Sequence, residues 1–196
     1  MVYDVRKRER MRIEATKKLF TVDEFYRIIE TGIFPEGQRV ELIDGEIIEM
    51  SPIGTRHAGC VNRANTFFTE AFGRNAIVSI QNPLRLSEFT EVLPDVVVFK
   101  PRADFYVSER PTPADVFFLV EVADTTLRYD RNVKVPRYAA AGIAEVWIED
   151  LKGDSLLVYR DPAEKTFKTS LTLHRGDSVS PLAFPAVKFK VEDLLG

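Results

Sequence analysis

The feature of the sequence that most constrains the fold is the apolar segment VFFLVEVA, residues 116–123. Its side chains do not alternate between apolar and polar, as they would in a strand with one face in water. We therefore expect a buried strand that other elements cover on both faces. Glu121 lies inside this strand, and an ionised carboxylate is costly to bury unless a cation, a metal ion or a shifted pKa compensates for it. Which of these compensates for Glu121 is the question that the sequence poses.

The segments around this strand predict a mixture of helices and strands. Capping-box spacing at Thr21 predicts a helix that ends near Gly32, and apolar residues at spacings of three and four predict another. A third helix is expected to start only near Lys134 or Val135, because Pro136 belongs in a first helical turn. The predicted helices cover 21–32, 57–72 and 134–142, and the other predicted strands cover 40–50 (a hairpin around Asp44-Gly45), 76–80, 84–86, 95–99, 144–150, 155–160, 166–173 and 187–189.

These elements predict an α/β or α+β domain with a mixed central β-sheet flanked by helices. Residues 19–196 are expected to form this single domain, since 196 residues suit one domain and no linker interrupts them. The Pro-rich, polar segment 100–114 is predicted to be a loop or a lid. Residues 1–18 carry seven basic and three acidic side chains. This basic leader is either a phosphate contact or a solvated, frayed end.

Composition excludes several classes of protein. No apolar run approaches the ~20 residues that span a bilayer, and the N-terminus lacks the apolar region of a secretory signal. A single cysteine, Cys60, excludes an internal disulfide and a cysteine-rich zinc site, and it suits the cytoplasm. We therefore expect a cytoplasmic protein without a membrane partner. The net charge of −3 shows no global attraction to nucleic acid.

Common catalytic motifs are absent from the sequence. There is no Gly-rich phosphate loop of the type GxGxxG or GxxxxGK, and no GxSxG elbow for a serine nucleophile. The two histidines, His57 and His174, are too far apart in sequence for a typical zinc spacing.

Carboxylates in apolar strands are the remaining candidates for chemistry. Asp95 begins the apolar segment DVVVF, and Glu121 follows in the next long apolar strand. If these strands are neighbours, both carboxylates can bind one Mg²⁺ or Mn²⁺ ion, which prefer oxygen ligands. Lys134 could then orient or activate an attacking water. The alternative is structural: a salt bridge between Glu121 and Lys134 or an arginine, and a turn-capping role for Asp95.

A third acid lies on an apolar face of the early hairpin. With a two-residue turn at Asp44-Gly45, Glu41 faces the same side as Ile48. The two interpretations are an acid with a functional partner and a tolerated charge on an edge strand.

The order VELIDGEI (40–47), PDVVVF (94–99) and FLVEVADTTLRYDRNVKVPRYAAAGIAEVWIED (118–150) resembles the Uma-type restriction-endonuclease family. This family is a branch of the PD-(D/E)XK nuclease superfamily. The resemblance covers about Thr21 to Asp161 and leaves the leader and the C-terminal tail outside. It implies a restriction-endonuclease-like fold, a divalent metal ion, a DNA substrate and a homodimer, since such enzymes often pair subunits to cut both strands.

The resemblance also assigns roles to particular residues. Pro94-Asp95 matches the PD element and Glu121 matches the second acid, so Asp95 and Glu121 would be metal ligands. The simplest superfamily pattern has a lysine two residues after this acid, where this chain has Ala123. In this branch the lysine lies on the following helix, which is where Lys134 stands.

Three further positions follow from the resemblance. Glu41 would correspond to an extra acid that precedes the core sheet and helps to hold a metal ion or the water. Asp130, four residues before Lys134, could orient that lysine or cap a helix. His57 falls where the family often has histidine, near the start of the long helix, with a structural hydrogen bond as the alternative.

The sequence thus predicts a metal-dependent endonuclease in which Asp95 and Glu121 hold Mg²⁺ or Mn²⁺ and Lys134 serves the attacking water. Tyr138 and Trp147 are interpreted as core residues rather than as platforms for bases. Two alternatives stay open. The first is a nuclease fold that binds nucleic acid or assembles without turnover, and the second is a hydrolase of another phosphoester.

Overall fold

The computed structural model describes residues 16–196, so most of the expected basic leader lies outside the described residues. The main element is a six-stranded sheet in which only β7 and β8 run parallel. The order of its strands is β10 (Thr166–His174), β9 (Ser155–Ala163), β8 (Glu145–Asp150), β7 (Val116–Ala123), β6 (Val96–Phe99) and β3 (Ile77–Ile80).

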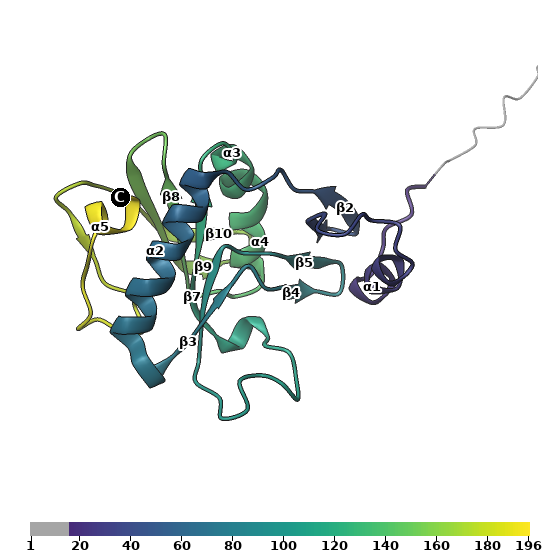
Figure 1. The fold of residues 1–196 in the computed structure, drawn as a ribbon, viewed down its shortest axis with the longest axis horizontal. Coiled ribbons are helices and arrows are strands. Elements are labelled where there is room, and N and C mark those ends of the chain that lie inside the picture. The colour runs from purple at the N-terminus through teal and green to yellow at the C-terminus, as the bar shows by residue number, and fades with distance from the viewer. Residues whose placement is uncertain (1–15) are drawn as a thin grey trace, which may run out of the picture.

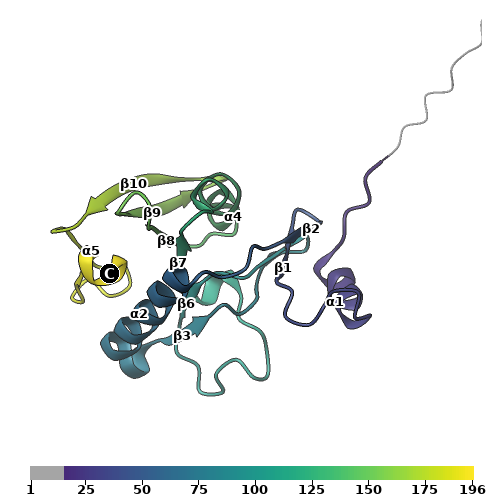
Figure 2. The same cartoon turned by 45° about the horizontal axis from the view of Figure 1, so that its top comes forward.

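Helices cover both faces of this sheet (Figures 1 and 2). The long helix α2 (Thr55–Phe72) and the short C-terminal α5 (Val191–Leu195) pack on one face, around a core that includes Trp147. Helix α4 (Val135–Ala140) packs on the other face, where Tyr138 is buried. The expected buried strand, covered on both faces, is therefore confirmed, as are the mixed sheet and its flanking helices.

A second, four-stranded sheet lies at the N-terminal side of the molecule (Figure 2). Its strands, in order, are β2 (Glu46–Glu49), β1 (Val40–Ile43), β5 (Thr90–Val92) and β4 (Leu84–Ser87). The β1–β2 turn has positive φ at Asp44 (49°) and Gly45 (81°), which is the pattern of the predicted hairpin turn. Helix α1 (Val22–Glu30) begins with the predicted capping box at Thr21.

The connection from β7 to β8 contains more helical structure than the sequence predicted. The chain is already helical in α3 (Leu127–Tyr129), passes through a π-helical turn (Asp130–Lys134) and continues into α4. In the π turn the Val135 N–H donates to the carbonyl of Asp130, five residues earlier. This shifted pairing lets the chain place Pro136, which has no N–H, without breaking the helical path. The predicted start of the regular helix near Lys134 or Val135 is therefore confirmed for α4, whereas the α3 turn and the π turn before it were not predicted.

Smaller differences concern element ends. Helix α2 begins at Thr55, two residues before the predicted start, and the three-residue strand β5 was not predicted. The strand expected over 187–189 is β12 (Phe189–Lys190), which pairs with β11 (Ser178–Val179). Short elements such as these carry little periodic signal, so their limits depend on tertiary contacts.

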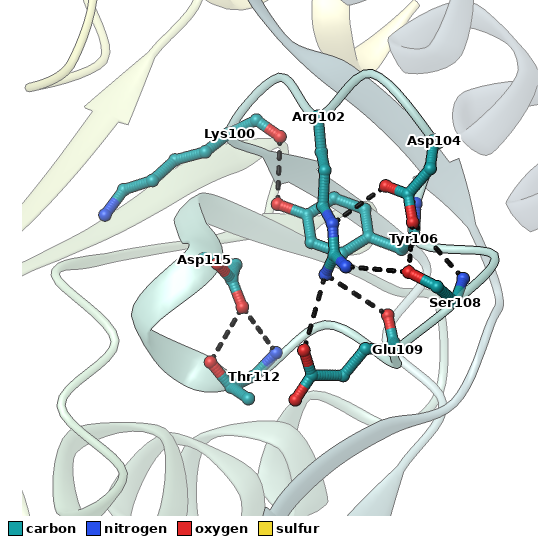
Figure 3. Close-up of polar contacts among 8 residues, drawn as sticks. All are labelled: Lys100, Arg102, Asp104, Tyr106, Ser108, Glu109, Thr112 and Asp115. Atoms are coloured by element: carbon teal, nitrogen blue, oxygen red, sulfur yellow. Dashed lines mark hydrogen bonds and ion pairs between the residues drawn. The ribbon is translucent and has the colours of Figure 1, made fainter.

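The segment between β6 and β7 is a loop stabilised by its own polar contacts (Figure 3). Asp104 accepts hydrogen bonds from the backbone N–H groups of Tyr106 and Ser108, and the Arg102 guanidinium lies over the Tyr106 ring. The loop leaves β6 at Phe99, whereas Asp95 precedes the other end of that strand. It is therefore a loop at the opposite end of β6 from Asp95 and not a lid over that residue.

Candidate active site

Sheet topology brings the two predicted metal ligands to the same end of the central sheet. Strands β6 and β7 are antiparallel neighbours, with Val96 opposite Val120. Asp95 immediately precedes Val96 and Glu121 immediately follows Val120, so both carboxylates lie at one end of this strand pair. The condition on which the sequence prediction depended, that the two strands are neighbours, is met.

A lysine joins two acids that are distant in sequence. Lys134 Nζ lies 2.9 Å from Glu41 Oε1 and 3.1 Å from Glu121 Oε1. The Tyr138 hydroxyl also donates to Glu121 Oε1, and the Leu93 N–H donates to Glu41 Oε1 at 2.8 Å. The three charged residues are almost completely buried, with exposed fractions of 1% for Glu41 and 2% for both Glu121 and Lys134. The predicted salt bridge is thus present, and it includes Glu41 as well.

Burial and neighbouring charges set the protonation of this group. Burial raises the pKa of Glu121 to about 8, and the nearby Lys134 ammonium opposes that shift. Burial alone would lower the pKa of Lys134, but the charges of Glu121 and Glu41 outweigh burial and raise it. We therefore take Lys134 as charged near neutral pH. Its one ammonium group is the shared partner of two carboxyl groups. A further cation would favour the ionised form of Glu121.

Asp95 has a different set of partners. Its Oδ2 lies 3.0 Å from His57 Nε2 and accepts a 2.9 Å hydrogen bond from the Val122 N–H, while Oδ1 accepts from Gln81 Nε2 at 3.0 Å. Burial alone would raise the pKa of Asp95, but the hydrogen bond and charge of His57, with the bonds from Gln81 and Val122, lower it. Asp95 is thus held in its ionised form. The turn-capping alternative does not describe these contacts, which come from α2, from the end of β3 and from β7.

His57 and Asp130 also lie beside Asp95, Glu121 and Lys134. His57 stands in the first turn of α2 and contacts Asp95, and its buried Nδ1 makes no hydrogen bond within the described residues. Asp130 is buried, accepts a 2.7 Å hydrogen bond from Thr126 Oγ1, and has a pKa that burial raises to about 6 against the opposing charge of Lys134. Asp130 lies within the helical segment and makes no ion pair with Lys134 in residues 16–196. It therefore neither caps a helix start nor orients Lys134 through direct contact.

These side chains line a cavity of about 190 Å³. Asp95, Glu121, Asp130, Lys134 and His57 all contribute to its wall, whereas Glu41 lies behind Lys134 and does not. Other polar members of the wall are Arg39, Ser51, Asp124, Thr125 and Thr126. Within residues 16–196 no group of three or more His, Cys, Asp or Glu side chains is arranged to hold a metal ion. A cation here would depend on the carboxylate pair and on water, which is how Mg²⁺ commonly binds.

The family match covers most of the chain. Residues 22–192 match the Uma2 family, described as "Putative restriction endonuclease". The chain belongs to the Uma2 family. The match extends about 30 residues beyond Asp161, so the expectation that the C-terminal tail lies outside the resemblance was wrong.

A solved structure has the same fold as this Uma2 chain. It is the crystal structure of "a putative nuclease belonging to DUF820" from Anabaena variabilis ATCC 29413, with a TM-score of 0.69 and 17% sequence identity. The alignment covers 90% of the Uma2 chain and 97% of the other chain. At this identity the similarity shows the fold alone. No curated protein matches the sequence, and no described helix is long and apolar enough to cross a membrane.

Two contributors to this site escaped the sequence analysis. Gln81 follows β3 with a positive φ of 52°, and its backbone N–H donates to the Asp95 carbonyl while its side chain binds the carboxylate. A polar residue directly after the strand IVSI was the available signal. Tyr138 and Trp147 are core residues as predicted, but the Tyr138 hydroxyl also binds Glu121. Ala123, where the simplest superfamily pattern has its lysine, is fully buried.

Proposed function

We propose that this Uma2 chain is a divalent-metal-dependent endonuclease that hydrolyses phosphodiester bonds in DNA. The observation that supports this most is the buried Lys134, held between Glu41 and Glu121 at the wall of a cavity that also contains Asp95. A buried lysine with two acids is a costly arrangement that apolar residues could replace, so its presence beside a cavity favours a functional role. The family description and the nuclease-like fold support the same class of enzyme.

The residues present suit a hard divalent cation. Asp95 and Glu121 offer carboxylate oxygens, and Glu121 Oε2 makes no hydrogen bond within the described residues, since both partners of this side chain bind Oε1. The buried Glu41 Oε2 also lacks a hydrogen-bond partner there. Asp95 and Glu121 would hold Mg²⁺ or Mn²⁺, which when bound stabilises negative charge on a phosphoryl group and lowers the pKa of water.

The remaining residues would position the reactants. The charged Lys134 would donate a hydrogen bond to the attacking water or to a phosphoryl oxygen, where negative charge develops. Glu41 would fix Lys134 through their 2.9 Å contact and is itself fixed by the Leu93 N–H. Tyr138 would keep Glu121 Oε1 occupied and so leave Oε2 for the cavity side. His57 and Gln81 would hold Asp95 in place and ionised.

A second function is favoured by the contacts of Asp95. A carboxylate has about four acceptor positions, and three groups already donate to Asp95 or lie within hydrogen-bonding distance of it. These contacts leave about one acceptor position for a metal ion, which suits a nuclease fold that binds nucleic acid or assembles without turnover. In that case the Lys134 group would be structural.

The test is cleavage of supercoiled and linear DNA with Mg²⁺, Mn²⁺ or EDTA. We expect metal-dependent cleavage by the wild type and its loss in Asp95→Asn, Glu121→Gln and Lys134→Ala. Lys152→Ala, an exposed lysine in the β8–β9 turn, is the matched control and should cleave normally. Circular dichroism on each variant would separate loss of chemistry from loss of fold. DNA binding without cleavage by any metal would favour the second function. The expected homodimer and cytoplasmic location stay predictions.

A further inference from the structure

The size of the candidate active site limits what it can contain. Its cavity has a volume of about 190 Å³. This volume is below the roughly 300–1,000 Å³ that is typical of small-molecule sites. That space suits a phosphoryl group with a hydrated cation but not a nucleoside as well. The sugar and base beside a bound phosphate must therefore lie in a neighbouring space.

Such a space adjoins the site. A second cavity, of about 650 Å³, lies between the end of β2 and the α3–π-turn segment. Met50, Ser51, Thr125 and Thr126 line both cavities, so the two adjoin along these residues. Its volume is within the range of roughly 300–1,000 Å³ that is typical of small-molecule sites.

The wall of the larger cavity combines the surfaces that a nucleotide needs. Ile48, Val133 and Tyr129 provide apolar and aromatic surface, and Asn132 provides an amide. Arg128 is exposed there and makes no ion pair or side-chain hydrogen bond within the described residues. Glu49 is the acidic residue among the described residues that line the larger cavity. An unpaired guanidinium beside an apolar wall is complementary to a phosphate attached to a base.

We propose that the larger cavity binds the nucleotide next to the scissile phosphate and that Arg128 binds the following phosphate. A base can enter such a cavity only when it is unstacked and unpaired. The substrate class is therefore single-stranded or locally opened nucleic acid rather than intact duplex. The inference deepens the proposed nuclease function and rests on it for the position of the scissile phosphate.

The experiment measures binding of the full chain to a labelled single strand of about 12 nucleotides, within the range of known single-strand sites, and to the corresponding duplex. Fluorescence anisotropy in Ca²⁺ at several salt concentrations gives the affinity and its salt dependence. Arg128→Ala removes the proposed phosphate contact. Thr125→Trp places a large side chain where the two cavities adjoin, and Thr125 is exposed, so the fold should tolerate it. Arg131→Ala is the control, because Arg131 is exposed on the π turn that follows α3 and lines neither cavity.

We expect the single strand to bind more tightly than the duplex. Arg128→Ala should weaken single-strand binding about tenfold at low salt and reduce the salt slope by about 0.7. Thr125→Trp should weaken it by a similar factor without changing the slope, and Arg131→Ala should have little effect. Equal affinity for duplex and single strand, equal losses in Arg128→Ala and Arg131→Ala, or no binding to either probe would overturn the inference.

Two results distinguish failure of the proposed nuclease function from failure of the proposed nucleotide cavity. If the binding pattern is as expected but Mg²⁺ and Mn²⁺ support no cleavage, the nucleotide cavity stands and the enzymatic role does not. If cleavage occurs but Arg128→Ala and Thr125→Trp change neither KM nor binding, the nuclease stands and the cavity assignment is wrong.

Discussion

The molecule has two groups of charged side chains that differ in burial. At the candidate site, Lys134, Glu41 and Glu121 are almost fully buried, and burial raises the pKa of Glu121. In the loop of Figure 3 the Arg102 and Asp104 side chains are 34% and 35% exposed, and the hydrogen bonds of Ser108 lower the pKa of Asp104. The pKa values of Glu121 and Asp104 therefore shift in opposite directions, although each carboxylate has a hydrogen-bonding and a cationic partner.

The reason for this difference is the balance between desolvation and hydrogen bonding. In the loop, water still reaches the charges, and backbone N–H groups from two residues of the same turn complete the shell of Asp104. At the site, the partners come from elements far apart in sequence, and one ammonium serves two acids. The contacts of Asp104 thus stabilise a turn locally. The burial of Glu41, Glu121 and Lys134 is energetically unfavourable, and a bound metal ion would offset part of this cost.

Removal of the Lys134 ammonium should change the stability of the protein more than any other substitution proposed here. Lys134→Met leaves two acids buried without their ammonium, so we expect the free energy of unfolding to fall by about 3–5 kcal/mol. Urea denaturation at pH 7 measures this, with Lys152→Met as the exposed control. The double variant Lys134→Met with Glu121→Gln should recover part of the loss. A loss no larger than that of the control would show that the acids are not effectively buried.

Replacement of a buried acid without a partner should have the opposite sign. Glu149 on β8 is fully buried, neither of its carboxylate oxygens has a hydrogen-bond partner in the described residues, and burial raises its pKa well above the ordinary value. Glu149→Met removes this group at nearly constant volume and should stabilise the fold by about 1–3 kcal/mol. Urea denaturation checks the sign. Destabilisation would mean that Glu149 has a partner, such as an internal water.

The raised pKa of Glu121 predicts a pH dependence of stability. The folded-state pKa of about 8 lies above the ordinary value of 4.5. The folded protein therefore keeps a proton that the unfolded chain releases, so this contribution is present below about pH 4.5 and is lost as the pH rises through about 8. Between pH 6 and pH 7 in EDTA, wild type should lose up to about 1.4 kcal/mol more than Glu121→Gln. Equal slopes for the two proteins would mean that Glu121 is ionised throughout.

The smallest effect is expected in the exposed loop. Asp104→Ala removes the acceptor for the Tyr106 and Ser108 N–H groups, so hydrogen exchange at these two amides should become faster. Exchange within β6 and β7 should not change. Glu109→Gln, which alters only a 3.9 Å contact with Arg102, is the control and should leave both amides as they are. A change that spreads into the central strands would show that the loop contributes to global stability.

Much of the fold could be predicted from local patterns. The unbroken apolar run from Val116 to Ala123 required cover on both faces, and the Asp44-Gly45 turn and the capping box at Thr21 each act over a few residues. The candidate acids Asp95 and Glu121 were recognisable because charges in apolar strands are costly. Lys134 was recognisable from the order of residues shared with the family, and Pro136 indicated the start of α4. The π turn before α4 was not predicted, since it leaves no periodic signal of its own.

The sequence by itself therefore determined which segments are buried and which charges are out of place in them. Tertiary structure decided how those charges are compensated: Glu41 and Glu121 converge on Lys134 from separate sheets, and Gln81 and His57 converge on Asp95. Burial is a property of a short pattern and can be read from it. Which residues pair with a buried charge depends on the order of the strands and on a helical turn that can be tens of residues away. Both are fixed only when the whole chain packs.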